Sequence, residues 1–195
     1  MVKTKIAVLV SGGGTNLQAL LDAQKAGKIP HGEIALVISN KEGAYALTRA
    51  ENSGVKHMVI TGKDFESRLQ EALVENGIQM IVLAGFMKIL SGEFTSKWPE
   101  RILNIHPALI PSFCGEGYYG LRVHEEALRY GVKVTGATVH FVNEVPDGGR
   151  IIAQKAVDIL DGDTPEILQR RVMEQAEWIL LPKAVEIVAE QLSTQ

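Results

Sequence analysis

Three residues in the second half of the chain could combine acid–base and electrostatic chemistry. Asn104 and His106 stand two apart in the run Asn-Ile-His-Pro, and Asp147 lies in a Pro-Asp-Gly-Gly turn. They supply a neutral hydrogen-bond donor, an imidazole and a carboxylate, but neither segment holds a nucleophilic hydroxyl or thiol. The only cysteine, Cys114, lies further along in a glycine-rich segment. Such a set stabilises developing charge and moves protons, which favours direct transfer of an acyl group between two bound substrates.

A glycine-rich turn near the N-terminus predicts a contact with a phosphate. Residues 11–16 read Ser-Gly-Gly-Gly-Thr-Asn and stand between an apolar run and a helical pattern. Glycines let the backbone approach an anion, and the N–H groups at a helix start favour negative charge. A dinucleotide site fits poorly, because Leu17 stands where a third glycine belongs and Ser39-Asn40 follows the second strand instead of an acid. The alternative is a tight turn without a ligand.

The elements that must position these residues alternate between strands and helices. We expect strands at residues 5–10, 33–38, 55–60, 78–83 and 102–105, and helices at residues 16–25, 44–52 and 64–75. This alternation predicts an α/β fold with a doubly wound, mainly parallel sheet and helices on both faces. Ligands bind such sheets at the carboxyl ends of the strands. The glycine turn, residues 84–87 and the Asn104–His106 segment all fall at that edge.

The pattern changes after Pro107. Residues 107–123 are rich in proline, glycine and tyrosine, which predicts a long functional loop. The β-rich runs 134–141 and 151–157 are expected to pair as a hairpin and to add antiparallel edge strands. Thr164 and Pro165 have the residue types that start a helix, and this long C-terminal helix should be kinked or ended by Pro182 before it continues to residue 192.

Asp147 and the histidines each allow a second interpretation. A carboxylate near His106 would raise the pKa of the imidazole, but Pro-Asp-Gly is also ordinary turn chemistry. His106, His140 and Asp147 could instead form a two-histidine, one-carboxylate metal site. We expect no metal, because no His-x-x-x-His or Cys-x-x-Cys spacing is present and Asn104 would go unexplained. His31 and His57 are expected on the surface, His124 at the start of a short helix, and Trp98 and Trp178 as packing residues.

Composition limits the classes of function. The 195 residues carry a net charge of −3 without a run of Lys or Arg, which argues against nucleic acid as the main partner. A single cysteine fits a reducing cytoplasm. The first apolar segment is too short for a signal peptide or a membrane span, so we expect no membrane contact. A monomer and a homodimer remain equally open.

Four motifs together resemble the phosphoribosylglycinamide formyltransferases, in order and over essentially the whole chain. They are Ser-Gly-Gly-Gly-Thr-Asn-Leu-Gln at residues 11–18, Ala-Gly-Phe-Met-Lys-Ile-Leu at 84–90, Asn-Ile-His-Pro-Ala-Leu-Ile-Pro at 104–111, and Gly-Ala-Thr-Val-His at 136–140 with Asp-Gly-Gly at 147–149. The resemblance implies transfer of a formyl group from 10-formyltetrahydrofolate to the amine of 5'-phosphoribosylglycinamide, a step of de novo purine biosynthesis. It implies one formyltransferase domain over residues 1–195, with a nucleotide-binding half to about residue 103 and a catalytic, folate-binding half from about residue 104.

The resemblance also implies roles for individual residues. Asn104, His106 and Asp147 would be the catalytic residues. Glu177 would reach the ribose of the nucleotide, and the phosphate side would be bound by Gly13, Gly14, Thr15 and Asn16. The residues that would contact the folate are Lys63, Met87, Lys88, Ile89, Leu90, Asn104, Val142, Asn143 and Glu144. Three positions depart from the family pattern, because Lys88 stands where arginine is common, Lys63 only approximates a folate-contacting arginine, and Arg150 replaces a frequent proline.

Related activities provide the rival hypotheses. A methionyl-tRNA formyltransferase would need a further C-terminal domain with a basic surface, and a formyltetrahydrofolate hydrolase would normally add an N-terminal regulatory domain. A non-catalytic phosphate- or nucleotide-binding protein is the rival from another class. It would require Asn104, His106 and Asp147 to be structural residues.

Overall fold

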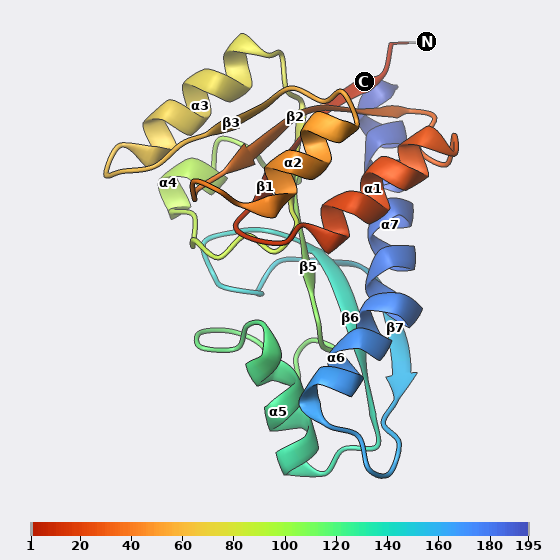
Figure 1. Cartoon of the computed structure of the whole chain (residues 1–195). Coiled ribbons are helices and arrows are strands. Elements are labelled where there is room, and N and C mark those ends of the chain that lie inside the picture. Colours follow the sequence, from red (N-terminus) through yellow and green to blue (C-terminus); the bar gives the residue numbers. More distant parts are fainter. Residues whose placement is uncertain (1, 195) are drawn as a thin grey trace.

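One seven-stranded sheet organises the chain, with strand order β3-β2-β1-β4-β5-β6-β7 (Figure 1). The computed structural model describes residues 2–194. The parallel strands are β1 (Thr4–Val10), β2 (Gly32–Ser39), β3 (His57–Val59), β4 (Met80–Leu83) and β5 (Ile102–His106). They confirm the predicted doubly wound order. β3 is shorter than the predicted strand because it is an edge strand that pairs with β2 over only three residues.

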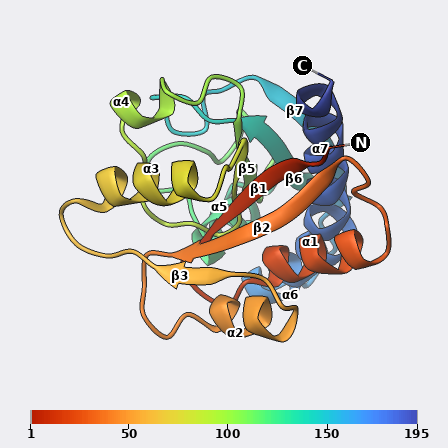
Figure 2. The same cartoon turned by 90° about the horizontal axis from the view of Figure 1, so that it is seen from above.

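Helices cover both faces of the sheet, as Figure 2 shows from above. The helices between the parallel strands are α1 (Thr15–Lys25), α2 (Tyr45–Asn52), α3 (Phe65–Glu75) and the short α4 (Gly92–Thr95). β1 is buried on both faces: Ile6, Val8 and Val10 belong to the core under α1 and α2, and Ala7 and Leu9 to the core under α3 and α4. A continuous apolar run is what such a strand requires.

The C-terminal strands form the predicted antiparallel hairpin. β6 (Val134–Phe141) pairs antiparallel with β5 on one side and with β7 (Ile151–Asp158) on the other. The helix α5 (Leu121–Tyr130) precedes this hairpin. It begins three residues before His124, which is buried within it rather than placed at its start. The predicted loop is therefore three residues shorter, because Leu121–Val123 already belong to the helix.

The long C-terminal helix does not end at Pro182, one of the two outcomes that the sequence predicted there, and it continues beyond this residue as expected. It comprises α6 (Pro165–Val172), a π-helical turn η1 (Met173–Glu177) and α7 (Trp178–Ser193), so the chain stays helical through Pro182. A proline inside a helix costs about 3 kcal/mol. The neighbouring Leu180, Leu181, Ala184 and Val185 are buried against the sheet, and each large apolar side chain contributes about 1.5–3 kcal/mol. Packing therefore outweighs the proline, and the helix continues.

The structure also tests the predictions for two histidines and the two tryptophans. His57 is exposed, as predicted, whereas His31 is partly buried, with its Nδ1 2.5 Å from Oε1 of Glu186 in α7. Trp98 is packed in the core under α3, and Trp178 is half-buried at the start of α7. Among residues 2–194, no helix is long and apolar enough to cross a membrane.

Candidate active site

The end of β5 brings the predicted catalytic residues together. Asn104 and His106 stand two apart in this strand and project to the same face, as strand geometry requires. Asp147 follows the end of β6 and reaches both of them. Its Oδ1 lies 3.5 Å from Nδ2 of Asn104, and its Oδ2 lies 3.5 Å from Nδ1 of His106. The sequence placed Asn104 and His106 on one face, and the β5–β6 pairing supplies the carboxylate.

Asp147 is a shared acceptor rather than a simple turn residue. Its backbone has a φ of +55°, a left-handed conformation that aspartate adopts more readily than most residues. The N–H of Gly115 donates to Oδ2 at 2.9 Å, and Nε2 of His140 lies 3.4 Å from Oδ1. Burial alone would raise the pKa of Asp147, but the neighbouring His140 and His106 rings and the Gly115 N–H together lower it. The carboxylate is therefore ionised.

His106 has a lowered pKa, so the prediction that Asp147 would lift it above the ordinary value is wrong for this structure. The side chain is only 4% exposed, and burial disfavours the charged imidazolium. Asp147 and the Phe113 carbonyl raise the pKa, His140 lowers it, and burial outweighs the favourable contacts. Nε2 donates to the Phe113 oxygen at 2.8 Å, which leaves Nδ1 facing Asp147. Neutral His106 is thus poised to take a proton at Nδ1.

His140 was considered only as a metal ligand, and the structure gives it a place beside Asn104. The two residues are register partners across β5 and β6. Nδ1 of His140 lies 2.7 Å from the Phe141 carbonyl, which can only accept, so this nitrogen carries the proton. In that tautomer Nε2 accepts from the Asn104 amide at 3.2 Å. His140 therefore orients Asn104, a role that depends on the β5–β6 register, which the sequence analysis did not predict.

The geometry of these side chains also bears on the metal hypothesis. His106 and His140 both direct a nitrogen at the Asp147 carboxylate itself. Within residues 2–194, no group of three or more His, Cys, Asp or Glu side chains has the arrangement of metal ligands.

A cavity of about 750 Å³ opens over these residues. Most of the predicted ligand contacts line it: Thr15, Asn16, Met87, Lys88, Ile89, Leu90, Asn104, His106, Val142, Asn143, Asp147 and Glu177. Gly13, Gly14, Lys63 and Glu144 do not line it in this structure. Further lining comes from Gly115–Gly120 of the predicted functional loop, from His140, which was considered as a metal ligand, and from residues not singled out for binding, namely His124, Gln169 and Met173. The sequence of the 107–123 loop has no clear periodicity. Its position over the cavity is therefore visible only in the tertiary structure.

His124 forms part of the cavity wall and is almost completely buried. Burial, and secondarily the proximity of His106, lower its pKa to about 4, and neither ring nitrogen has a hydrogen-bond partner in the described chain. A neutral imidazole has one donor and one acceptor, and within the described chain both stay buried and unpaired.

The glycine turn positions the start of α1 at the cavity. Gly14 has a φ of +72°, and a Cβ added there would lie 2.6 Å from Cβ of Ala46 in α2. The Gly12 carbonyl accepts from the Ala46 N–H at 3.0 Å, and the Gly13 carbonyl accepts from Nε of Arg49 at 2.8 Å. Close packing of α1 against α2 therefore requires a glycine at position 14.

We expect Gly14→Ala to lower the free energy of unfolding by about 1–3 kcal/mol, because it combines overpacking with a left-handed backbone. Gly12→Ala is the matched control, since a Cβ there meets nothing within 4 Å and its φ is outside the left-handed region. Urea denaturation of the two variants measures the difference. Equal stability would show that the turn relaxes without cost.

Asn16 and Glu177 form a buried pair on the wall of the cavity. Nδ2 of Asn16 donates to Oε2 of Glu177 at 2.6 Å, while Oδ1 of Asn16 is buried without a partner in the described chain. Burial raises the pKa of Glu177 to about 7, and the hydrogen bond from Asn16 only partly opposes it. A carboxyl group that is neutral near pH 7 can both donate and accept a hydrogen bond.

The raised pKa of Glu177 predicts a pH-dependent stability. Between about pH 4.5 and pH 7 the unfolded chain releases the Glu177 proton while the folded chain keeps it. The free energy of unfolding should therefore fall over this range, by up to about 3 kcal/mol. Glu177→Gln keeps an acceptor for Asn16 and should remove the fall, whereas the exposed Glu75→Gln should keep it. Denaturation at pH 4.5 and pH 8 tests this, and parallel profiles for wild type and Glu177→Gln would contradict it.

The predicted folate-contacting residues divide into two groups. Met87 and Ile89 are exposed apolar side chains, at 48% and 66%, on the segment after β4 that lines the cavity. Lys88 places its Nζ 4.4 Å from the centre of the Phe65 ring. Lys63, between β3 and α3, is exposed, as is Glu144 after β6. The cavity lining therefore includes exposed apolar side chains, Met87 and Ile89, as well as the polar pair Asn16 and Glu177.

Comparison with known proteins gives consistent matches. The family described as formyl transferase matches residues 4–185. The chain is 47% identical over 193 residues to the trifunctional purine biosynthetic protein adenosine-3 of Gallus gallus, which covers 96% of this chain and 18% of that protein. It is 42% identical over 192 residues to the phosphoribosylglycinamide formyltransferase of Haemophilus influenzae, covering 95% of this chain and 87% of that one. The chain thus spans only about a fifth of the trifunctional relatives.

A solved structure agrees with the fold over the same range. The crystal structure of glycinamide ribonucleotide transformylase 1 from Symbiobacterium toebii superposes with a TM-score of 0.89 at 42% identity. The superposition covers 97% of this chain and 89% of that one.

Proposed function

Because this chain belongs to the formyl transferase family, we propose that it transfers a formyl group from 10-formyltetrahydrofolate to the amine of 5'-phosphoribosylglycinamide, a step of de novo purine biosynthesis. One observation carries the proposal. Asn104, His106 and Asp147 meet on the wall of a single cavity whose other wall holds the start of α1 and Glu177. Such a cavity can hold two substrates with the transfer chemistry between them.

The chemistry follows from the absence of a protein nucleophile among these residues. The substrate amine attacks the formyl carbon, a C–N bond forms, and the carbonyl oxygen becomes an oxyanion. The Asn104 amide donates to this oxygen, and protonated His106 stabilises it. The attacking nitrogen loses a proton, the folate nitrogen gains one, and the C–N bond to the folate breaks. Asp147 favours the charged form of His106 while the oxyanion exists.

His106 must change partners for this step. In the structure its Nε2 donates to the Phe113 carbonyl, so this N–H is not available to a substrate. Phe113 has a φ of +49°, a conformation that is costly for a residue with a Cβ. We propose that substrate binding replaces the Phe113 contact, which frees His106 for the formyl oxygen.

The two substrates take opposite ends of the cavity. The ribose phosphate lies at the start of α1, bound by Gly13, Gly14, Thr15 and Asn16, with Glu177 at the ribose hydroxyls. The N–H groups of a helix start favour a phosphate there. The folate lies over Met87–Leu90 and the Val142–Glu144 backbone, with its acidic tail toward Lys63 and Lys88. This assignment follows the apolar side chains of Met87 and Ile89 and the polar side chains of Asn16 and Glu177, which all line the cavity.

Cys114 takes no part in this mechanism. Burial, followed by the nearby Asp147 charge, raises the pKa of its thiol, which makes it a poor nucleophile at neutral pH. We expect Cys114→Ser to retain turnover within about threefold of wild type, because direct transfer needs no formyl-enzyme. Steady-state kinetics and mass spectrometry test this. A trapped formyl thioester, together with an inactive serine variant, would overturn direct transfer.

The test of the proposed function is whether release of tetrahydrofolate from the 10-formyl donor requires 5'-phosphoribosylglycinamide. Spectroscopic assays with and without the nucleotide separate three outcomes. Dependence on the nucleotide, with formylated nucleotide as product, supports the transferase. Release without the nucleotide would indicate a hydrolase, and binding without release would indicate a non-catalytic protein.

The domain organisation and the cellular compartment belong to the same proposal. We propose one formyltransferase domain with a nucleotide-binding and a folate-binding half, acting on small molecules in the cytoplasm. The unpaired, half-buried Cys114 is compatible with a reducing compartment. Gel filtration coupled to light scattering distinguishes a monomer from a homodimer.

A further inference from the structure

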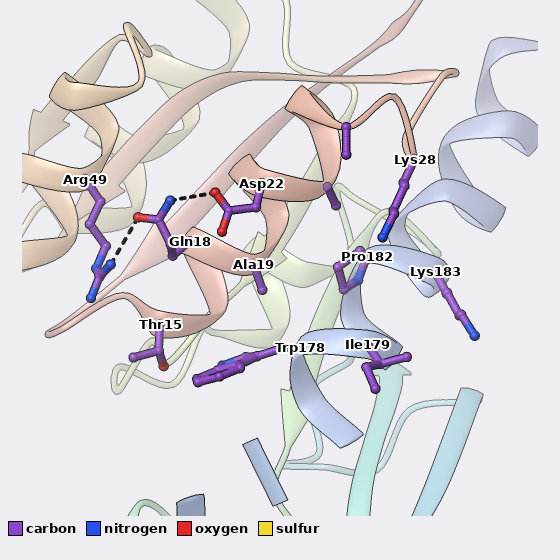
Figure 3. A pocket seen from close by; sticks show the side chains of 12 residues that line it. Thr15, Gln18, Ala19, Asp22, Lys28, Arg49, Trp178, Ile179, Pro182 and Lys183 are labelled. Carbon is purple, nitrogen blue, oxygen red and sulfur yellow. Dashed lines mark hydrogen bonds between the residues drawn. The ribbon is translucent and has the colours of Figure 1, made fainter. Parts of the chain in front are cut away.

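A second cavity lies beside the first, in the groove between α1 and α7 (Figure 3). It measures about 570 Å³, a volume typical of small-molecule sites. Its apolar lining is made of small or compact side chains: Ala19, Ala23, Ala26, Ile179 and Pro182. Alanines where two helices face each other leave the groove unfilled. The catalytic residues do not line it, so the proposed reaction does not account for it.

The polar lining of this groove is cationic, although the whole chain carries a net charge of −3. The lining holds three cationic side chains, Lys28, Lys183 and Arg49, and a single carboxylate, Asp22. Arg49 is already engaged, with Nε on the Gly13 carbonyl and a second nitrogen 3.0 Å from Oε1 of Gln18. Lys28 and Lys183 form no ion pair or side-chain hydrogen bond with any residue of the described chain. Two uncompensated ammonium groups in one groove favour an anionic ligand.

The remaining polar groups fit a planar ring. Trp178 lines the groove with its indole, a surface on which rings stack. Its Nε1 is buried and has no hydrogen-bond partner within residues 2–194. Nε2 of Gln18 donates to Oδ1 of Asp22 at 2.9 Å, as Figure 3 shows, so the other Asp22 oxygen remains open to an N–H donor.

From these contacts we propose that the α1–α7 groove binds a nucleoside monophosphate whose base carries an amino group. The base stacks on Trp178 and packs against Pro182. Its amino group donates to Asp22, and the phosphate is neutralised by Lys28 and Lys183. Thr15 lines both cavities, and Trp178 directly follows Glu177, so a bound nucleotide contacts the two segments that carry the polar end of the larger cavity. The binding itself does not depend on the reaction proposed there.

Tryptophan fluorescence can test the proposal, because the chain has only two tryptophans. Trp98 is buried in the other core, so Trp98→Phe leaves Trp178 as the sole reporter. We expect AMP to change the fluorescence with saturation in this variant. Adenosine lacks the phosphate, IMP lacks the amino group, and each should bind at least about tenfold more weakly, as expected for loss of a charged contact. Titrations are repeated with 5'-phosphoribosylglycinamide present.

Three variants sharpen the test. Lys28→Ala/Lys183→Ala should weaken AMP at least about tenfold, whereas Lys155→Ala, an exposed lysine on β7, should not. Asp22→Asn should abolish the preference for AMP over IMP. AMP binding that survives the double lysine variant, or that the phosphoribosylglycinamide displaces, would place the nucleotide in the larger cavity and overturn the proposal. Absence of binding by both fluorescence and calorimetry would also overturn it. If the double variant fails to fold, the AMP-to-IMP preference of Asp22→Asn decides.

Discussion

Asn104→Ala and His106→Ala should each lower kcat by at least about 10²–10³, the usual effect of removing one group that stabilises an oxyanion. Nucleotide affinity should change little, because neither residue is among those proposed to bind the ribose phosphate. The loss should appear in kcat rather than KM, since the contact strengthens only as charge develops on the formyl oxygen. Steady-state assays with both substrates, and nucleotide titration by calorimetry, measure the two effects separately.

The matched controls are Asn52→Ala in α2 and His57→Ala in β3, which remove the same side-chain types from exposed positions. Both should retain wild-type turnover. Circular dichroism and thermal unfolding must show that the β5 variants remain folded, because His106 is almost fully buried. Near wild-type turnover in either folded β5 variant would remove that residue from the transfer step.

Asp147→Asn should lower the pKa of His106 further and shift the pH dependence of turnover. Asp147 raises the His106 pKa against the larger effect of burial, so the neutral amide leaves burial less opposed. Activity that requires the imidazolium should then be lost at a lower pH than in wild type. Above this transition, each unit by which the pKa falls lowers the imidazolium fraction about tenfold. NMR titration of the His106 ring and the pH–rate profile are the two measurements.

The substitution keeps the size of the side chain, and an amide oxygen can still accept from the Gly115 N–H. Asp161→Asn is the control, because Asp161 is a fully exposed aspartate in the turn after β7, 3.9 Å from Lys133. It should leave both the ring titration and the pH–rate profile unchanged. If Asp147→Asn also leaves both unchanged, with and without bound nucleotide, Asp147 has only the role of a turn residue.

Local sequence patterns predicted the helices and strands and the chemistry that their residues can present. The apolar run at residues 5–10 predicted a strand covered on both faces, and the spacing of Asn104 and His106 put both on one face. The strands alternating with helices predicted the parallel order, and the motifs pointed to the formyl transferase family. These features were readable because each depends on residues close together in the chain.

The effects of residues far apart in the chain on one another depend on the folded arrangement and were not predicted. Burial of His106 reverses the pKa shift expected from Asp147, and no local pattern reports how much solvent a folded chain removes. His140 orients Asn104 through pairing between two strands, and packing against the sheet carries α7 through Pro182. The groove between α1 and α7 exists because two helices separated by more than 150 residues place alanines and lysines opposite each other. Burial, strand register and helix contact are set by the whole chain at once, which is why they could not be read segment by segment.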